Sequence, residues 1–124
     1  MPEKRILVID DEINLCMVVQ ACLENLGGWE TLIALSAREG LAIAQTQQLD
    51  AILLDVMMPD IDGITLFREL QKDSVTQAIP VILFTAKASS SDLEQFAKLG
   101  IAGVIVKPFD PMTLAEEVAS TLGW

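Results

Sequence analysis

Short apolar runs alternate with segments of helical hydrophobic spacing along the whole chain. Most of these runs are rich in Ile, Leu and Val without polar interruption, which is typical of strands buried on both faces. The pattern predicts five strands, at residues 5–9, 29–35, 51–54, 80–84 and 104–106. A segment with apolar residues at helical spacing follows each strand, so strand and helix alternate five times.

Helix-start and helix-stop residues support this alternation. Two Ser-x-x-Glu capping boxes begin at Ser36 and Ser91, and Asp110 followed by Pro111 has the form of an N-cap with proline at the first helical position. Gly27 ends the first helical pattern. The helices are therefore expected at about residues 13–26, from 36 onward, at 64–72, from 91 onward and from 110 onward.

Five such units predict an α/β fold with a doubly wound parallel sheet. Continuous apolar strands need helices on both faces of the sheet, and crossovers between parallel strands are right-handed almost without exception. In open sheets of this kind the functional crevice lies beyond the carboxyl ends of the strands. Residues that directly follow the strands are therefore the first candidates for a site.

Composition and charge narrow the class of protein. The chain has 124 residues, of which 52% are hydrophobic and 21% charged, so one well-cored domain is expected. Eight Lys and Arg residues stand against 18 Asp and Glu, which gives a net charge of −10, and the basic residues are scattered. We therefore expect no direct binding to nucleic acid and no insertion into a membrane.

The cysteine and histidine content narrows the class of protein further. Cys16 and Cys22 lie on one predicted helix and are expected to be reduced thiols packed as small hydrophobes. Neither a signal peptide nor a run of membrane-spanning length is apparent, so a cytoplasmic protein is expected. The sequence has no histidine, which excludes a phosphohistidine or a histidine-based catalytic site on this chain.

Acidic residues stand at the ends of two strands that are expected to be buried. Asp10 and Asp11 follow the first strand, and Asp55 follows the third. Carboxylates held close together raise one another's pKa and cost stability, unless a cation lies among them. Sites made of oxygen ligands suit Mg²⁺. The same edge receives Thr85 from the fourth strand and Lys107 from the fifth.

This set of groups suits phosphoryl transfer to a carboxylate. Asp55 would be the nucleophile and a metal ligand, while Asp10 and Asp11 would hold Mg²⁺. Lys107 would contact one phosphoryl oxygen, and Thr85 would donate a hydrogen bond to another. The donor must come from outside, because the chain offers neither a histidine nor a second nucleophile.

Four ordered stretches resemble the receiver domain of two-component response regulators. They are ILVIDDE at residues 6–12, LLDVMMPDIDG at 53–63, FTA at 84–86 and VKPF at 106–109. The resemblance covers all 124 residues and implies a flavodoxin-like sheet of order 2-1-3-4-5. It also implies a single receiver domain over residues 1–124 with no output domain.

The resemblance implies a role for each residue of the site. Asp55 is expected to be the phosphoacceptor, and the backbone carbonyl of Met57 is expected to join the three aspartates around Mg²⁺. Lys107 is expected to pair with Asp55 or its phosphoryl group, and the Lys107–Pro108 peptide is expected to be cis. Thr85 is expected to be the hydroxyl that moves toward the phosphoryl group.

The chain departs from the receiver pattern at two places. Val104 stands where the family usually has an aromatic ring that turns inward on switching, and a β-branched valine has little to swing. Ala102 and Gly103 replace acidic residues that many DNA-binding regulators use in dimer salt bridges, so a charged dimer face is not expected. Glu12 is expected to be a solvated helix-start residue, and Asp60 and Asp62 to form a turn.

The function implied is a phosphorylation-dependent signalling switch. A histidine kinase or histidine phosphotransfer protein would supply the phosphoryl group, and a downstream protein effector would read the result. The chain would catalyse only its own phosphorylation and dephosphorylation, so it is not expected to be a conventional enzyme. The alternative is a pseudo-receiver, a binding module that works without phosphorylation, which Val104 leaves open.

Other enzyme and cofactor classes fit less well. A phosphatase of the haloacid-dehalogenase type would have a second acid at position 57, where this chain has Met57. A flavodoxin would need an uncharged phosphate loop after the first strand, where the acidic run lies. Neither a P-loop nor a dinucleotide-binding glycine pattern is present.

Overall fold

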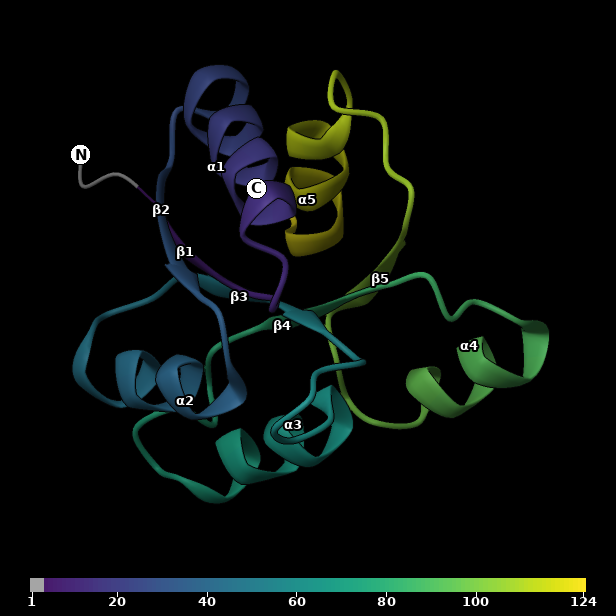
Figure 1. The fold of residues 1–124 in the computed structure, drawn as a ribbon. Helices are drawn as coiled ribbons and strands as arrows, with labels where there is room; N and C mark the ends of the chain where they lie inside the picture. The colour runs from purple at the N-terminus through teal and green to yellow at the C-terminus, as the bar shows by residue number, and fades with distance from the viewer. Residues whose placement is uncertain (1–3) are drawn as a thin grey trace.

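The computed structural model describes residues 4–124, which form one parallel sheet covered by helices on both faces (Figure 1). The strands are β1 (Arg5–Ile9), β2 (Glu30–Ala34), β3 (Ala51–Asp55), β4 (Val81–Thr85) and β5 (Gly103–Val106). They are arranged in the order β2-β1-β3-β4-β5. Both the fold class and the strand order expected from the sequence are confirmed, and each strand lies within one residue of its predicted bounds.

Five helices follow the strands and divide between the two faces. They are α1 (Ile13–Gly27), α2 (Ala37–Thr46), α3 (Gly63–Lys72), α4 (Ser90–Ala97) and α5 (Leu114–Leu122). In Figure 1, α1 and α5 lie above the sheet and α2, α3 and α4 lie below it. Two apolar cores result, because alternate residues of each buried strand point to opposite faces. Ile6 and Val8 join the core under α1 and α5, whereas Leu7 and Ile9 join the core with α2 and α3.

The strand order brings the predicted site residues to one edge. β1 lies between β2 and β3, and its last residue Ile9 pairs with Leu54, the residue before Asp55. The chain leaves β1 toward one face through α1 and leaves β3 toward the other through α3. The ends of β1 and β3 therefore flank the point at which the winding reverses, where crevices form in such sheets.

The helix starts show where local signals are reliable and where they are not. The N-cap predicted at Ser36 is confirmed, since Ser36 Oγ accepts a hydrogen bond from the Glu39 N–H at 3.2 Å, but the Glu39 carboxylate accepts from the Leu35 N–H and not from Ser36, so the reciprocal half of the box is absent. The box predicted at Ser91 is wrong: Ser89 is the N-cap of α4, and Asp92 completes the box by accepting from the Ser89 N–H at 3.2 Å. Ser89, Ser90 and Ser91 are all candidates for the N-cap. Ser89 takes this position because Asp92, three residues later, forms the reciprocal hydrogen bond.

The last helix also begins later than predicted. Residues 111–113 form a turn in which the Asp110 side chain accepts from the Met112 N–H at 2.9 Å. The Asp110 carbonyl then accepts from the Leu114 N–H at 3.0 Å, and α5 starts at Leu114. Asp110 therefore caps this preceding turn, which delays the helix.

The two cysteines behave as expected from the sequence. Cys16 and Cys22 are both free and both buried on α1, in the core shared with α5. Burial raises the pKa of the Cys22 thiol. No helix of residues 4–124 is long and apolar enough to cross a membrane.

Candidate functional site

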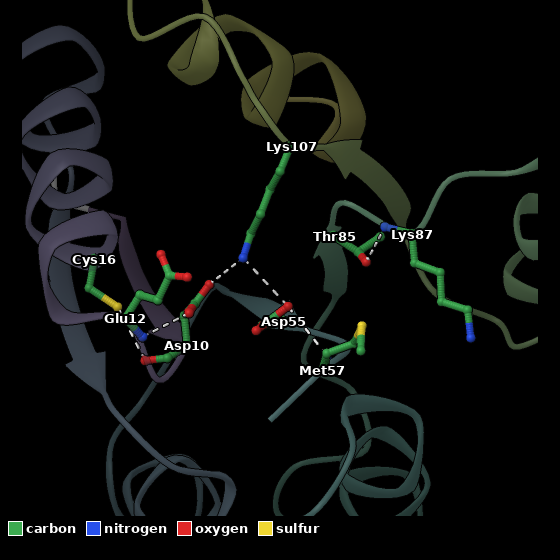
Figure 2. A network of polar contacts seen from close by, with 8 residues as sticks. All are labelled: Asp10, Glu12, Cys16, Asp55, Met57, Thr85, Lys87 and Lys107. Carbon is green, nitrogen blue, oxygen red and sulfur yellow. Dashed lines mark hydrogen bonds and ion pairs between the residues drawn. The ribbon is translucent and has the colours of Figure 1, made fainter. Parts of the chain in front are cut away.

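Four neighbouring strands deliver polar side chains to the carboxyl edge of the sheet. Asp10 directly follows β1, Asp55 is the last residue of β3, Thr85 is the last residue of β4, and Lys107 directly follows β5. In Figure 2 the side chain of Lys107 points between those of Asp10 and Asp55, and Thr85 lies on the side toward Lys87. The apolar strands fix these positions, because their side chains are packed on both faces and leave little freedom at the strand ends.

Three carboxylates form a cluster suited to a cation. One oxygen from each of Asp10, Asp11 and Asp55 can be chosen so that all three lie within 4.8 Å of one another. Asp10 is 1% exposed and Asp55 is 6% exposed, whereas Asp11 is open to solvent. Among residues 4–124, this is the one group of at least three acidic, cysteine or histidine side chains with such geometry.

The donor set fits a hard divalent cation. Every candidate ligand atom in the cluster is a carboxylate oxygen, which is the ligand type that Mg²⁺ and Ca²⁺ take. The Asp10 carboxylate is held by the Glu12 N–H, which donates to its Oδ1 at 3.0 Å. Glu12 itself is exposed and lies outside the cluster, as expected from the sequence.

Lys107 reaches between two of the carboxylates (Figure 2). Its Nζ donates to Asp10 Oδ2 at 2.7 Å and lies 3.5 Å from Asp55 Oδ1. Burial lowers the pKa of Lys107, but the hydrogen bond and charge of Asp10 and the charge of Asp55 outweigh this effect, so the pKa is raised overall. Lys107 therefore stays charged. The pairing of Lys107 with Asp55 is expected from the resemblance to receiver domains, whereas its shorter contact with Asp10 is not.

The ionised form of Asp55 is disfavoured by its surroundings at this edge. Burial raises its pKa, and the nearby charge of Asp10 raises it further. Lys107 and the Met57 N–H, which donates to Asp55 Oδ1 at 3.4 Å, lower the pKa but do not cancel the increase. An added cation would relieve this repulsion, which is the arrangement expected where acidic side chains share a bound ion.

Thr85 lies at the same edge, and its hydroxyl is bonded to the loop that follows β4. Its side chain is 1% exposed, and Oγ1 accepts a hydrogen bond from the Lys87 N–H at 2.9 Å (Figure 2). The Lys107 N–H donates to the Thr85 carbonyl at 2.8 Å, but within residues 4–124 no hydrogen bond joins the Thr85 hydroxyl to Asp55 or to Lys107. The hydroxyl is therefore near the acidic cluster but bonded to the loop that leads to α4.

The loop between β3 and α3 folds back over the end of β3. The Gly63 N–H donates to the Val56 carbonyl at 2.7 Å, and a side chain at Gly63 would collide with the Asp55 carbonyl oxygen. Met57 is 69% exposed at the start of this loop, and Asp62 caps α3 by accepting from the Thr65 N–H at 2.9 Å. The loop holds the Met57 backbone beside the cluster.

Two contacts around the site were not predicted from the sequence. Asp60 lies in a bend of the β3–α3 loop, and its carboxylate also accepts from the Ala37 and Arg38 N–H groups, both at 3.2 Å, which ties this loop to the start of α2. The Cys16 thiol donates to the Asp10 carbonyl at 3.4 Å. Burial, and next the Asp10 charge, raise the pKa of Cys16 to about 12, so this thiol stays protonated.

The structure also locates two further features singled out in the sequence, Val104 and the Lys107–Pro108 peptide bond. Val104 lies in β5, opposite Leu83, and its half-buried side chain packs against the core with α2 and α3. The peptide bond between Lys107 and Pro108 is cis, as the resemblance implied.

Comparison with protein families gives a match over almost the whole chain. The response regulator receiver domain family matches residues 6–119. Protein PilH of Pseudomonas aeruginosa is 34% identical over 118 residues, which cover 95% of this chain and 97% of PilH. A probable transcriptional regulator, ycf27, of Cyanophora paradoxa is 37% identical over 120 residues, which cover 97% of this chain and 48% of the regulator. The chain thus spans about half the length of the regulators among these relatives.

Solved structures show the same architecture. Chemotaxis response regulator CheY4 of Vibrio cholerae has a TM-score of 0.89 and 29% identity, covering 97% of this chain and 99% of that chain. The receiver domain of sensor histidine kinase PA1611 of Pseudomonas aeruginosa has a TM-score of 0.86 and 27% identity, covering 99% and 100%. That domain has a magnesium ion coordinated in its active-site cleft.

Proposed function

The chain belongs to the response regulator receiver domain family of two-component signalling, and we propose that it accepts a phosphoryl group on Asp55 with Mg²⁺ and then changes its binding to other proteins. The observation that carries this proposal is the placement of Lys107 Nζ 3.5 Å from Asp55 within a cluster of three carboxylates. The proposed nucleophile, metal ligands and phosphoryl-binding cation would thus meet at one edge.

Asp55 is the proposed nucleophile. One of its oxygens forms a bond to phosphorus while the bond from phosphorus to the donor's histidine nitrogen breaks. The electron pair of that bond stays with the histidine nitrogen. Because Asp55 is buried beside Asp10, its carboxylate is poorly stabilised in the free protein. The reaction would replace this buried carboxylate with an acyl phosphate.

Mg²⁺ would be held by Asp10, Asp11, Asp55 and the Met57 backbone carbonyl. When bound, the ion would neutralise the carboxylates and the incoming phosphoryl charge. The oxygen-only donor set and the raised pKa of Asp55 support this assignment.

Lys107 and Thr85 would orient the phosphoryl group. The Lys107 ammonium, which stays charged, would contact one phosphoryl oxygen. The Thr85 hydroxyl has an unused proton, because its oxygen acts as the acceptor in the bond from Lys87. Donation of that proton to another phosphoryl oxygen would pull on the segment that leads into α4, and this is the proposed switching movement.

A second candidate function rests on Val104. Its side chain is already packed against the core and has no ring to turn inward. A pseudo-receiver, which binds its partner in one conformation regardless of phosphorylation, would need no such movement. Whether Asp55 accepts a phosphoryl group and whether phosphorylation changes the conformation of the chain therefore need separate tests.

The proposed partners follow from the chemistry. A histidine kinase or a histidine phosphotransfer protein would supply the phosphoryl group, and a protein effector would receive the signal. The chain would act only on its own Asp55, and so would not be an enzyme in the usual sense. A cytoplasmic location stays a prediction.

Intact mass measurement tests the proposal. The protein is incubated with a small acyl phosphate and Mg²⁺, beside Asp55→Asn and beside a sample with a chelator. We expect one added phosphoryl group, absent from both controls. Absence of an adduct under conditions that label an established receiver would favour the pseudo-receiver, and an adduct that persists in Asp55→Asn would reject Asp55 as the acceptor.

A further inference from the structure

A groove runs along α3 on the face of the molecule opposite α1 and α5. It consists of two hollows of about 610 and 500 Å³, which share Ile64 and Arg68 of α3 as lining residues. The first hollow extends to Met57 and Lys87, at the edge of the acidic site. The second extends to α4 and the residues that follow it. We call the two together the α3–α4 groove.

The floor of the α3–α4 groove is apolar. Met58 and Phe96 are almost fully buried beneath it, and Ile64 and Leu99 are half-buried along it. Met57 adds a side chain that is 69% exposed at one end. A partner that covers these side chains would remove apolar surface from water, which favours binding.

The rim of the groove is basic in an otherwise acidic protein. Arg68, Lys87 and Lys98 line it, and they are three of only eight basic residues in a chain of net charge −10. Within residues 4–124, neither Arg68 nor Lys98 forms an ion pair, and Lys87 has a weak one with Asp92 at 4.0 Å. The one acidic lining residue, Asp62, is engaged in capping α3.

We propose that the α3–α4 groove binds a segment of a partner protein that combines acidic and apolar side chains. An acidic segment would be repelled by most of this protein's surface and attracted to this rim, so charge would direct it to the groove. The three cations are spread along an apolar floor, which suits an extended or helical peptide better than a compact anion. The proposal does not depend on phosphorylation of Asp55, so its failure would leave the proposed function untouched.

A displayed library of random linear peptides, selected against the whole chain, provides the probe. The most enriched sequence is then made as a fluorescein-labelled peptide, and its affinity is measured by anisotropy. We expect enriched sequences to contain both acidic and apolar residues. Arg68→Glu and Lys98→Glu should each weaken binding roughly tenfold or more.

Lys72→Glu is the matched control. Lys72 also lies on α3 and carries the same charge, but it is exposed outside the groove and pairs with Glu69 at 3.7 Å. Its reversal should change the affinity by less than about twofold, since exposed ion pairs contribute little. Urea unfolding of all three variants verifies that they are folded.

Several outcomes would overturn the proposal. They are enriched peptides without acidic residues, binding that is indifferent to Arg68→Glu, or no enrichment at all. Displacement of the peptide by pyrophosphate at constant ionic strength would assign the groove to a small anion instead. A dimer in sedimentation that Arg68→Glu dissociates would assign it to a second copy of this chain.

Discussion

Lys107 and Asp10 form the shortest ion pair of residues 4–124, with 2.7 Å between Nζ and Oδ2, although 97 positions separate them in sequence. The pair is well shielded, since Asp10 is 1% exposed and the Lys107 side chain 18% exposed. Asp10 is therefore partly neutralised before any metal binds. Asp11, by contrast, forms no ion pair within residues 4–124 and faces solvent.

This difference makes Asp11 the clearest test of the metal site. Asp11→Asn should weaken Mg²⁺ binding roughly tenfold or more, because it removes a ligand charge without releasing Lys107. Isothermal titration calorimetry measures the change. Glu12→Gln is the control, because Glu12 is the next residue, carries the same charge and lies outside the cluster. If the two variants lose affinity equally, only the general negative charge of this edge attracts the ion.

Thr85 offers a test of the hydroxyl alone. Thr85→Val keeps the shape of the buried side chain but leaves the Lys87 N–H without its acceptor, so stability should fall by about 1 kcal/mol. Thr85→Ser keeps the acceptor and serves as the control for the hydrogen bond. Phosphoryl labelling of Asp55 by a small donor should persist in both, while the change in partner binding on labelling should be lost in Thr85→Val. Loss of labelling in Thr85→Val would instead place the hydroxyl in the transfer step.

The architecture could be predicted from the sequence because its signals are local and strong. Uninterrupted apolar strands such as residues 51–54 have few alternative environments, and their alternation with helices leaves few topologies. Helix starts are harder to predict, because neighbouring residues compete for one cap. Ser89, Ser90 and Ser91 differ in the residue that lies three positions ahead, and Asp92 decides in favour of Ser89.

The positions of Asp10, Asp55, Thr85 and Lys107 at strand ends are enough to predict that these residues share one edge of the sheet. Their individual contacts cannot be ranked in the same way, because the choice of Lys107 between two carboxylates depends on fractions of an ångström. Contacts between distant loops are equally hard to predict. Trp29 and Trp124 pack edge to face with ring centroids 5.1 Å apart, and no local pattern in the sequence indicates it.

The contact of Asp60 with α2 gives a pH dependence. Partial desolvation raises the pKa of Asp60, but the hydrogen bonds from the Ala37 and Arg38 N–H groups outweigh it, and the pKa is lowered from 3.8. The folded state therefore favours the carboxylate, and its stabilising contribution is complete above the unfolded pKa. It is lost as the pH falls through the lowered pKa of the folded state.

Asp60→Asn should accordingly be less stable than the parent at neutral pH, and the difference should shrink below pH 3.8. Urea unfolding over a pH series measures it. Glu94→Gln, which removes an exposed acid on α4, controls for the change in net charge. A difference between Asp60→Asn and the parent that stays constant across the series would show that the carboxylate charge has no part in holding the loop.

Gly63 links the fold of the loop to the chemistry of the site. An added Cβ would collide with the Asp55 carbonyl oxygen and lie 2.8 Å from Val56 Cα, and both are backbone atoms that cannot turn aside. Gly63→Ala should therefore lose roughly 1–3 kcal/mol of stability in urea unfolding and displace the end of β3.

Gly27→Ala provides the comparison for Gly63→Ala. A Cβ added at Gly27 would lie 2.8 to 3.0 Å from ring atoms of Trp29. The Trp29 side chain can shift to make room, whereas the Asp55 backbone carbonyl beside Gly63 cannot. Gly27→Ala should cost less stability and leave phosphoryl labelling of Asp55 intact, since it lies at the far end of α1 from the site. Gly63→Ala should slow that labelling even at temperatures where it is fully folded. Normal labelling in folded Gly63→Ala would mean that the position of the Asp55 backbone is less critical to the reaction than its close packing indicates.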